Sequence, residues 1–247
     1  MSTAAHDLTL HPAETRWTDT GLAHALSERG GVGPCAGAVL GRGANRVVVA
    51  DPSDPACCLK MELPVSLRTA VGMRARLRRR LGRVFPRLGE NATELRAWCR
   101  LSASLGPEML AGRIAESLEI VHGPAGSALR CAMVIDDDGR PAQSLHALMG
   151  APGLFTADAL CAAVDDFERW LHRHAIPLLD LNAGNFVVAG THEPRLVCVD
   201  AKSLLAGKEL LPVSRWIPAL RRRKIARRAE RLRQRIRAEL GTPVNLR

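Results

Sequence analysis

The stretch HAIPLLDLNAGNFVV, residues 174–188, places polar side chains between two apolar segments. Asp180 follows Ile-Pro-Leu-Leu, and Asn182 and Asn185 come before Phe-Val-Val. Asp180 could accept a proton from a hydroxyl group or align it, and the amide oxygen of Asn185 is a hard ligand suited to Mg²⁺. The alternative is that these side chains only cap backbone turns. A loop between a helix and a strand favours projection into a cleft.

Three charged residues elsewhere in the chain could act together with this loop. Lys60 stands within the apolar run CCLKM, where burying an ammonium is costly unless it meets an anion. Glu94 could be its partner, and Asp200 ends the apolar run RLVCVD, a position suited to a metal ligand. Each has a simpler interpretation: a solvent-facing lysine, an ordinary helix-start acid and a cap of the next segment.

Gly41 and Gly43 form a G-x-G pattern between two strand-like runs. Glycines there let backbone N–H groups approach a phosphate closely, although a plain hairpin turn also uses glycine. The pattern is not a dinucleotide-binding fingerprint, because a strand follows it and not a helix.

The first half of the chain shows mainly strand patterns. Apolar runs predict strands at 36–41, 46–50, 57–61, 117–123 and 128–136. Residues 90–106 predict a helix that Asn91 or Thr93 caps and Gly106 ends. The Arg-rich segment 67–83 is helical by composition, and the turn DDDGRP indicates a hinge.

After the hinge the pattern becomes helical. Residues 156–174 predict a helix that Thr156 caps, with a core-facing stripe formed by Leu160, Val164, Phe167 and Leu171. Strands are predicted at 185–189 and 195–200. The Arg-rich tail predicts a helix whose apolar stripe comprises Trp216, Leu220, Ile225, Ala229, Leu232, Ile236 and Leu240.

Two segments concentrate the positive charge of this chain, whose formal net charge is +10. Residues 63–89 contain eight arginines and no acid, and residues 215–239 contain eleven basic and two acidic residues. Such segments attract phosphate, nucleic acid or an anionic membrane face, or they form solvated helix faces. Aromatic residues make up only 3% of the chain, which argues against single-stranded nucleic acid as the partner.

The cysteines and the start of the chain bear on its compartment. Seven cysteines without a C-x-x-C pattern predict buried thiols in a reducing compartment and no structural zinc site. The first twenty residues lack the basic start and apolar run of a signal peptide, and no apolar run is long enough for a membrane span. We therefore expect a cytoplasmic protein, with peripheral contact at the inner membrane as a further option.

The order of these parts resembles that of protein-kinase-like phosphotransferases. Asp180 falls at the catalytic Asp, and Asn185 and Asp200 fall at the two metal-binding positions. More narrowly, the chain resembles the bacterial PhoP regulatory network protein YrbL family from about Val39 to Ile236. The segments that carry this resemblance are LGRGANRVVVADPSDPACCLK, ELRAW, MVIDDDGRPAQSL, RLVCVD and ELLPVSRWIPALRRRKIARR.

The resemblance implies an α+β, two-lobed protein-kinase-like fold. A flexible lead-in, 1–33, would precede a small N-lobe, 34–136, with an antiparallel sheet and one main helix. A reduced, mostly helical C-lobe with basic C-terminal helices would span 137–247.

The resemblance also implies ATP and Mg²⁺ as cofactors. Lys60, positioned by Glu94, would hold the α- and β-phosphates, and Asp180 would orient the acceptor hydroxyl. Asn185 and Asp200 would hold Mg²⁺. The residues implied to contact the nucleotide are Gly41, Gly43, Lys60, Met133, Ile135 and Asn182.

Several positions depart from the protein-kinase pattern. Arg46 replaces the third glycine of the phosphate loop, and Leu178 and Leu179 replace the His-Arg pair before the catalytic Asp. Asn182 replaces a lysine, and Ala201 follows Asp200 where kinases carry Phe. Loss of the arginine implies that no activation-loop phosphate controls this chain.

The expected function is therefore a kinase that transfers phosphate from Mg-ATP to an alcohol group. The acceptor would be a small molecule, a glycolipid or a protein with an envelope or regulatory role. The alternatives are a nucleotide-binding, pseudokinase-type regulatory module and a basic protein that binds nucleic acid or an anionic membrane. Contact with an anionic surface would use the Arg-rich segments 68–87 and 215–239.

Overall fold

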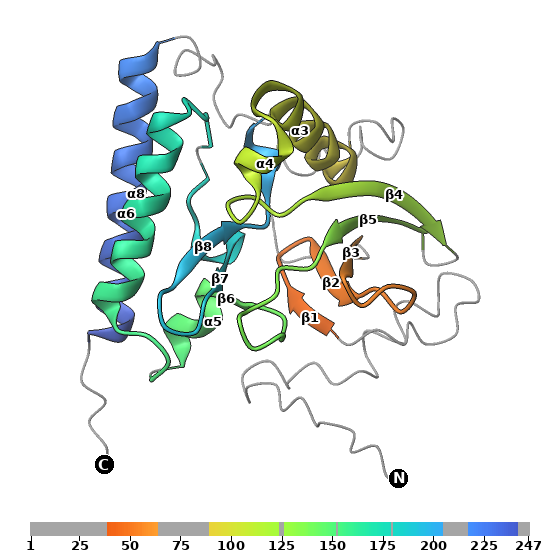
Figure 1. The fold of residues 1–247 in the computed structure, drawn as a ribbon, viewed down its shortest axis with the longest axis horizontal. Coiled ribbons are helices and arrows are strands. Elements are labelled where there is room, and N and C mark those ends of the chain that lie inside the picture. The colour runs from red at the N-terminus through yellow and green to blue at the C-terminus, as the bar shows by residue number, and fades with distance from the viewer. Residues whose placement is uncertain are drawn as a thin grey trace.

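The computed structural model describes six stretches of the chain, which form two antiparallel sheets and several helices (Figure 1). The described residues are 39–63, 89–123, 126–151, 153–178, 180–204 and 217–241. This arrangement confirms the α+β class. The two-lobed kinase-like arrangement and its boundaries stay predictions. The predicted lead-in 1–33, the helix at 67–83 and Trp216 lie outside the described residues.

The larger sheet has five strands in the order β1-β2-β3-β5-β4, and every neighbouring pair is antiparallel. The strands are β1 (Val39–Arg42), β2 (Arg46–Ala50), β3 (Cys57–Glu62), β4 (Ser117–Gly123) and β5 (Gly126–Ala132). All five were expected from the apolar runs. Side chains alternate between the two faces, so that Val47, Val49 and Met61 pack together on one of them.

Helix α3 (Glu90–Leu105) covers the other face of this sheet, where Cys58, Leu129 and Cys131 are buried. It ends at Gly106, as predicted, where a φ of 84° suits glycine. The predicted cap was wrong. Gly89 precedes the helix without a side-chain cap bond, and Thr93 Oγ1 donates to its carbonyl instead.

A smaller sheet follows, with strand order β6-β7-β8. Its strands are β6 (Gln143–Ser144), β7 (Phe186–Ala189) and β8 (Arg195–Cys198). The short helices α4 (Pro107–Leu110) and α5 (Leu145–Gly150) were not predicted, nor was β6. The segment before β4 is attached to β8, because the N–H of Ala115 donates to the carbonyl of Cys198. This attachment brings the end of β8 beside α3 and the larger sheet.

Two long helices, α6 (Ala157–Arg173) and α8 (Pro218–Leu240), lie side by side (Figure 1). Helix α6 packs against β8 of the smaller sheet, and α8 packs against α6 and α5. Thr156 caps α6 by accepting a hydrogen bond from the N–H of Ala159, as predicted. The predicted stripe of α6 is buried, and so are Ile225, Ala229, Leu232 and Ile236 of α8. Leu220 is exposed. No helix within the described stretches is long and apolar enough to cross a membrane.

Candidate functional site

Lys60 and Glu94 meet between the larger sheet and α3. Because side chains alternate along β3, Lys60 shares the α3-facing side with Cys58. Its Nζ lies 2.6 Å from Glu94 Oε1 and also donates to the carbonyl of Val199. Lys60 is 5% exposed and Glu94 is 1% exposed, so the solvent-facing interpretation of Lys60 is wrong. Burial alone would lower the pKa of Lys60, but Glu94 raises it, so the ammonium stays charged.

Arg46, at the start of β2, joins the same pair. Its Nη1 donates to Glu94 Oε2 and, at 3.3 Å, to Asn91 Oδ1. Its Nη2 lies 3.1 Å from Asp200 Oδ2. Burial opposes the charge of Arg46, but the attraction of Glu94 and Asp200 raises its pKa above the ordinary value. From the sequence, Arg46 was expected only to replace the third glycine of the phosphate loop. Its place between Gly-x-Gly and a valine run was the one available signal.

Asp200 follows the end of β8 and pairs with a second cation, Lys202, as well as with Arg46. Its Oδ2 lies 2.8 Å from Lys202 Nζ, and its Oδ1 accepts the N–H of Lys202 at 3.2 Å. The second contact agrees with the capping interpretation, since the 3₁₀ turn η4 (Ala201–Leu204) begins there. Burial would raise the pKa of Asp200, but Arg46 and Lys202 hold it below its usual range.

Glu90 completes the group. Its Oε2 lies 3.1 Å from Lys202 Nζ, and its Oε1 accepts a hydrogen bond from Asn45 at 3.1 Å. Burial opposes the charge of Glu90, but Lys202 and Arg46 lower its pKa. We call this group the ion-pair cluster; its three cations and three carboxylates belong to Arg46, Lys60, Lys202, Glu90, Glu94 and Asp200. It ties β2, β3 and α3 to the end of β8.

The loop with Asp180 is braced from within. Asn185 donates its side-chain amide to the carbonyl of Asp180 at 2.9 Å, and the N–H of Asn182 donates to the same oxygen at 3.0 Å. The 3₁₀ turn η3 (Ala183–Asn185) joins the loop to β8, because Val199 N–H donates to the carbonyl of Asn185. The neighbouring apolar side chains Ile176, Leu178, Leu181 and Ala183 are buried. They anchor the loop and leave Asp180 partly accessible.

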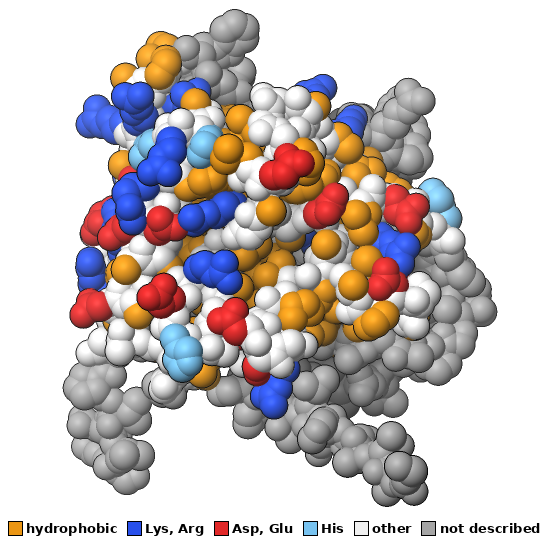
Figure 2. Space-filling view, in the orientation of Figure 1, with side chains coloured by type: hydrophobic (Ala, Val, Ile, Leu, Met, Phe, Trp, Pro, Cys, Tyr) orange, Lys and Arg blue, Asp and Glu red, His pale blue; other side chains and the backbone are white. Residues whose placement is uncertain are grey.

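Asp180 faces α8. Its Oδ1 lies 3.9 Å from Arg228 Nη1, and the two side chains are 25% and 36% exposed. The partly buried Arg221 and Lys224 lie four to seven residues earlier on α8, on the flank that Arg228 shares. Figure 2 shows many Lys and Arg side chains, with some Asp and Glu among them, over the region of α6 and α8. An anionic group beside Asp180 would therefore meet positive charge.

The oxygens of Asn185 and Asp200 are of the type that Mg²⁺ prefers, and backbone pairing places their segments side by side. No group of three His, Cys, Asp or Glu residues in the described stretches could hold a metal. A Mg²⁺ ion here would thus take few ligands from the protein and the rest from phosphate or water, which is usual for this ion.

Gly41 and Gly43 lie at the hairpin between β1 and β2. Among the described residues, a methyl group added at Gly41 would meet no atom within 4 Å, and one at Gly43 would touch the carbonyl of Arg46 at 3.7 Å. Neither has a positive φ, in contrast to Gly190. The fold itself therefore does not require glycine at 41 or 43, which fits the close approach of a ligand to the backbone.

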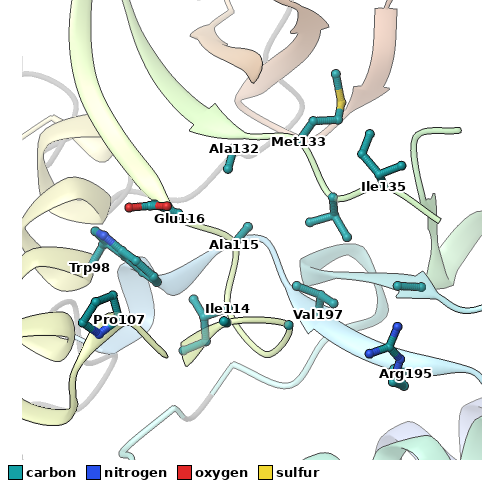
Figure 3. Close-up of a pocket in the computed structure, with 14 residues that line it drawn as sticks. Trp98, Pro107, Ile114, Ala115, Glu116, Ala132, Met133, Ile135, Arg195 and Val197 are labelled. Atoms are coloured by element: carbon teal, nitrogen blue, oxygen red, sulfur yellow. The ribbon is translucent and has the colours of Figure 1, made fainter. Parts of the chain in front are cut away.

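Met133 and Ile135 follow the end of β5, and Met133 packs against the buried side chains of Cys58, Leu129 and Cys131. Met133 and Ile135 line a hollow of about 290 Å³ between the end of β5, the segment before β4 and the β7–β8 hairpin (Figure 3). Trp98, Ile114 and Val197 contribute apolar walls. The lining includes none of the predicted phosphate- or metal-binding residues. The structure thus brings Lys60, Glu94 and Asp200 together, and it places Met133 and Ile135 at this hollow beyond the end of β5.

Among the described cysteines all but one match the expected burial, and Cys35 lies outside the described residues. Cys57, Cys58, Cys131, Cys161 and Cys198 are buried, and Cys99 is exposed. Burial raises the pKa of the Cys58 and Cys198 thiols to about 12. These two thiols are therefore protonated and unreactive at neutral pH.

Comparison with known proteins identifies a family. The model of a family described as PhoP regulatory network protein YrbL matches residues 36–237. A search of curated proteins finds no match. The matched range includes the ion-pair cluster, the Asp180 loop and most of α8.

Proposed function

The chain belongs to the PhoP regulatory network protein YrbL family, and we propose that it is a kinase-like phosphotransferase acting on a hydroxyl acceptor with Mg-ATP. The observation that carries the proposal is the buried contact between Lys60 and Glu94, held 2.6 Å apart. Burying a charged lysine costs free energy, and here Glu94 offsets that cost and holds the ammonium in a fixed place. In this proposal the five-stranded sheet with α3 is the N-lobe, and the remaining helices and sheet form the C-lobe.

Lys60 would bind the α- and β-phosphates, and Glu94 would hold its ammonium in place. Gly41 and Gly43 would let the hairpin backbone cover the phosphates, because neither position carries a side chain that fills the space. Met133 and Ile135 are the proposed adenine contacts, and Asn182 is a further nucleotide contact. Binding and positioning of the phosphates is the main task of the protein in phosphoryl transfer.

Asp180 would orient the acceptor hydroxyl and take its proton, which its partial exposure permits. Asn185 has two tasks: its amide nitrogen braces the carbonyl of Asp180, and its amide oxygen would hold Mg²⁺ together with Asp200. When bound, the ion neutralises charge on the phosphates. The acceptor itself, whether small molecule, glycolipid or protein, would approach beside α8.

The second candidate is a nucleotide-binding regulatory module without catalysis. The observation that favours it is the engagement of the Asp200 carboxylate by both Arg46 and Lys202. A carboxylate paired in this way is less available to a metal. In this candidate the chain would bind nucleotide and signal through its conformation.

A third candidate is contact with an anionic surface through α8. Ile225, Ala229, Leu232 and Ile236 are buried in the protein, so they do not insert into a membrane. The outer cations of α8 could still attract such a surface through charge alone, with strong salt dependence. This contact is compatible with the phosphotransferase activity. The proposed location, in the cytoplasm and peripheral at the inner membrane, is compatible with it too.

Release of ADP from Mg-ATP by the purified protein separates the first candidate from the second. We expect release that depends on Mg²⁺ and falls by about 100-fold or more in Asp180→Asn, the range for loss of a general base. The matched control is Asp138→Asn, which changes an exposed aspartate in the turn before β6 and should retain the full rate. Equal rates in all three proteins would exclude catalysis at Asp180 and favour the regulatory module.

A further inference from the structure

The guanidinium of Arg46 lies between two carboxylates that belong to different parts of the chain. One nitrogen reaches Glu94 on α3, and the other lies 3.1 Å from Asp200 beyond β8. Arg46 is 8% exposed and Glu94 is 1% exposed, so water screens these contacts little. Arg46 is therefore a component of the ion-pair cluster and not a side chain that happens to lie at its edge.

A single oxygen of Asp200 contacts both Arg46 and Lys202. Oδ2 lies 3.1 Å from Arg46 and 2.8 Å from Lys202 Nζ. A divalent ion that bound Asp200 would have to displace these cations or lie close to both of them. At such distances the divalent ion and these two cations would repel each other, and this repulsion would lower the affinity for the ion by about tenfold or more.

The formal charges of the ion-pair cluster also cancel, since three cations face three carboxylates. A bare divalent ion would add two positive charges to a neutral, largely buried group, which is unfavourable. A metal that arrives with a triphosphate brings excess negative charge, which can receive Arg46 and Lys202 as they leave Asp200.

We propose that Arg46 and Lys202 are internal counter-ions that occupy Asp200 until nucleotide arrives, so that this site takes up a divalent cation only together with phosphate. The proposal rests on the proposed nucleotide site and adds its regulation. It assigns a role to the arginine that stands in place of the third loop glycine.

Titration of the nucleotide-free protein with Mn²⁺, followed by calorimetry or by the electron paramagnetic resonance of free Mn²⁺, tests the proposal. The variants are Arg46→Gln and Lys202→Gln, each alone and combined with Asp200→Asn. Lys202 is 27% exposed, so its variant should fold even if Arg46→Gln does not. Arg113→Gln is the matched control, because it removes one of the two arginine partners of a different aspartate, Asp166.

We expect wild type and Arg113→Gln to bind Mn²⁺ equally weakly. Lys202→Gln and folded Arg46→Gln should bind it at least about tenfold more tightly, and Asp200→Asn should abolish that gain. The proposal is overturned if the folded variants gain no affinity or if the gain survives Asp200→Asn. The Mn²⁺ titration uses no ATP, so it is independent of turnover. If the variants gain no Mn²⁺ affinity while ATP turnover depends on Asp180, only the counter-ion proposal is contradicted. If the variants gain Mn²⁺ affinity but the protein does not turn over ATP, only the proposed phosphotransferase activity is contradicted.

Discussion

The side-chain amide of Asn185 lies 2.9 Å from the backbone carbonyl of Asp180 and donates a hydrogen bond to it. This bond closes the loop on which the proposed catalytic aspartate stands. The same side chain is therefore both a loop brace and a proposed metal ligand. A substitution there should change stability as well as any metal-dependent activity.

Replacing Asn185 with Ala should lower the free energy of unfolding by about 1 kcal/mol, because one partly buried hydrogen bond is lost. Asn182→Ala is the matched control, since Asn182 is exposed in the same loop and its change should stay within about 0.5 kcal/mol. Urea unfolding followed by circular dichroism measures both. Equal effects of the two substitutions would show that the brace does not stabilise the protein.

Ala175→Gly should stabilise the protein by about 1 kcal/mol, because a left-handed backbone costs alanine more than glycine. Ala175 follows α6 with a φ of 54°, where its N–H donates to the carbonyl of His172 and that of Ile176 donates to Leu171. This is the C-terminal pattern that usually takes glycine. A raised urea midpoint with an unchanged slope would agree, and a lowered midpoint would contradict this backbone conformation.

The ion-pair cluster should make stability sensitive to acid. The pKa values of Asp200 and Glu90 are lowered in the folded protein, so their contribution is complete above the ordinary values of 3.8 and 4.5. It is lost as the pH falls through the lowered values. We expect unfolding free energies that change little from pH 7 to about 5 and then fall steeply below about 4.

Asp200→Asn provides the comparison for this pH dependence. The variant should be less stable than wild type at pH 7 and should lose less stability between pH 5 and the acid limit. Measurement of urea midpoints across this range gives both slopes. Parallel curves for the two proteins would mean that Asp200 is not paired in the folded state.

Local patterns were enough to predict most of the elements. Short apolar runs identified all five strands of the larger sheet, and Thr156 and Gly106 correctly marked helix ends. Asn91 misled the prediction of the α3 start, because its side chain contacts Arg46 and the carbonyl of Lys60 instead of capping the helix. Strand β6 has only two residues, too few for a periodic pattern.

The candidate site could be predicted from the sequence only in part. The pairing of Lys60 with Glu94 could be predicted, since a lysine in an apolar strand needs an anion from the helix that covers it. The role of Arg46 could not, because its partners Glu94 and Asp200 lie 48 and 154 positions further along the chain. The attachment of the segment before β4 to β8 and the packing of η4 against α3 bring them together.

The most direct test of the central claim is calorimetric titration of the wild-type protein and of Lys60→Met with Mg-ATP. We expect wild type to bind one Mg-ATP and Lys60→Met to bind it at least about tenfold more weakly, since a charge-assisted contact with phosphate is lost. Arg113→Gln should bind as wild type does. If saturating Mg-ATP gives no heat with the wild-type protein and leaves its melting temperature unmoved, or if Lys60→Met binds equally well, Lys60 is not part of a nucleotide site.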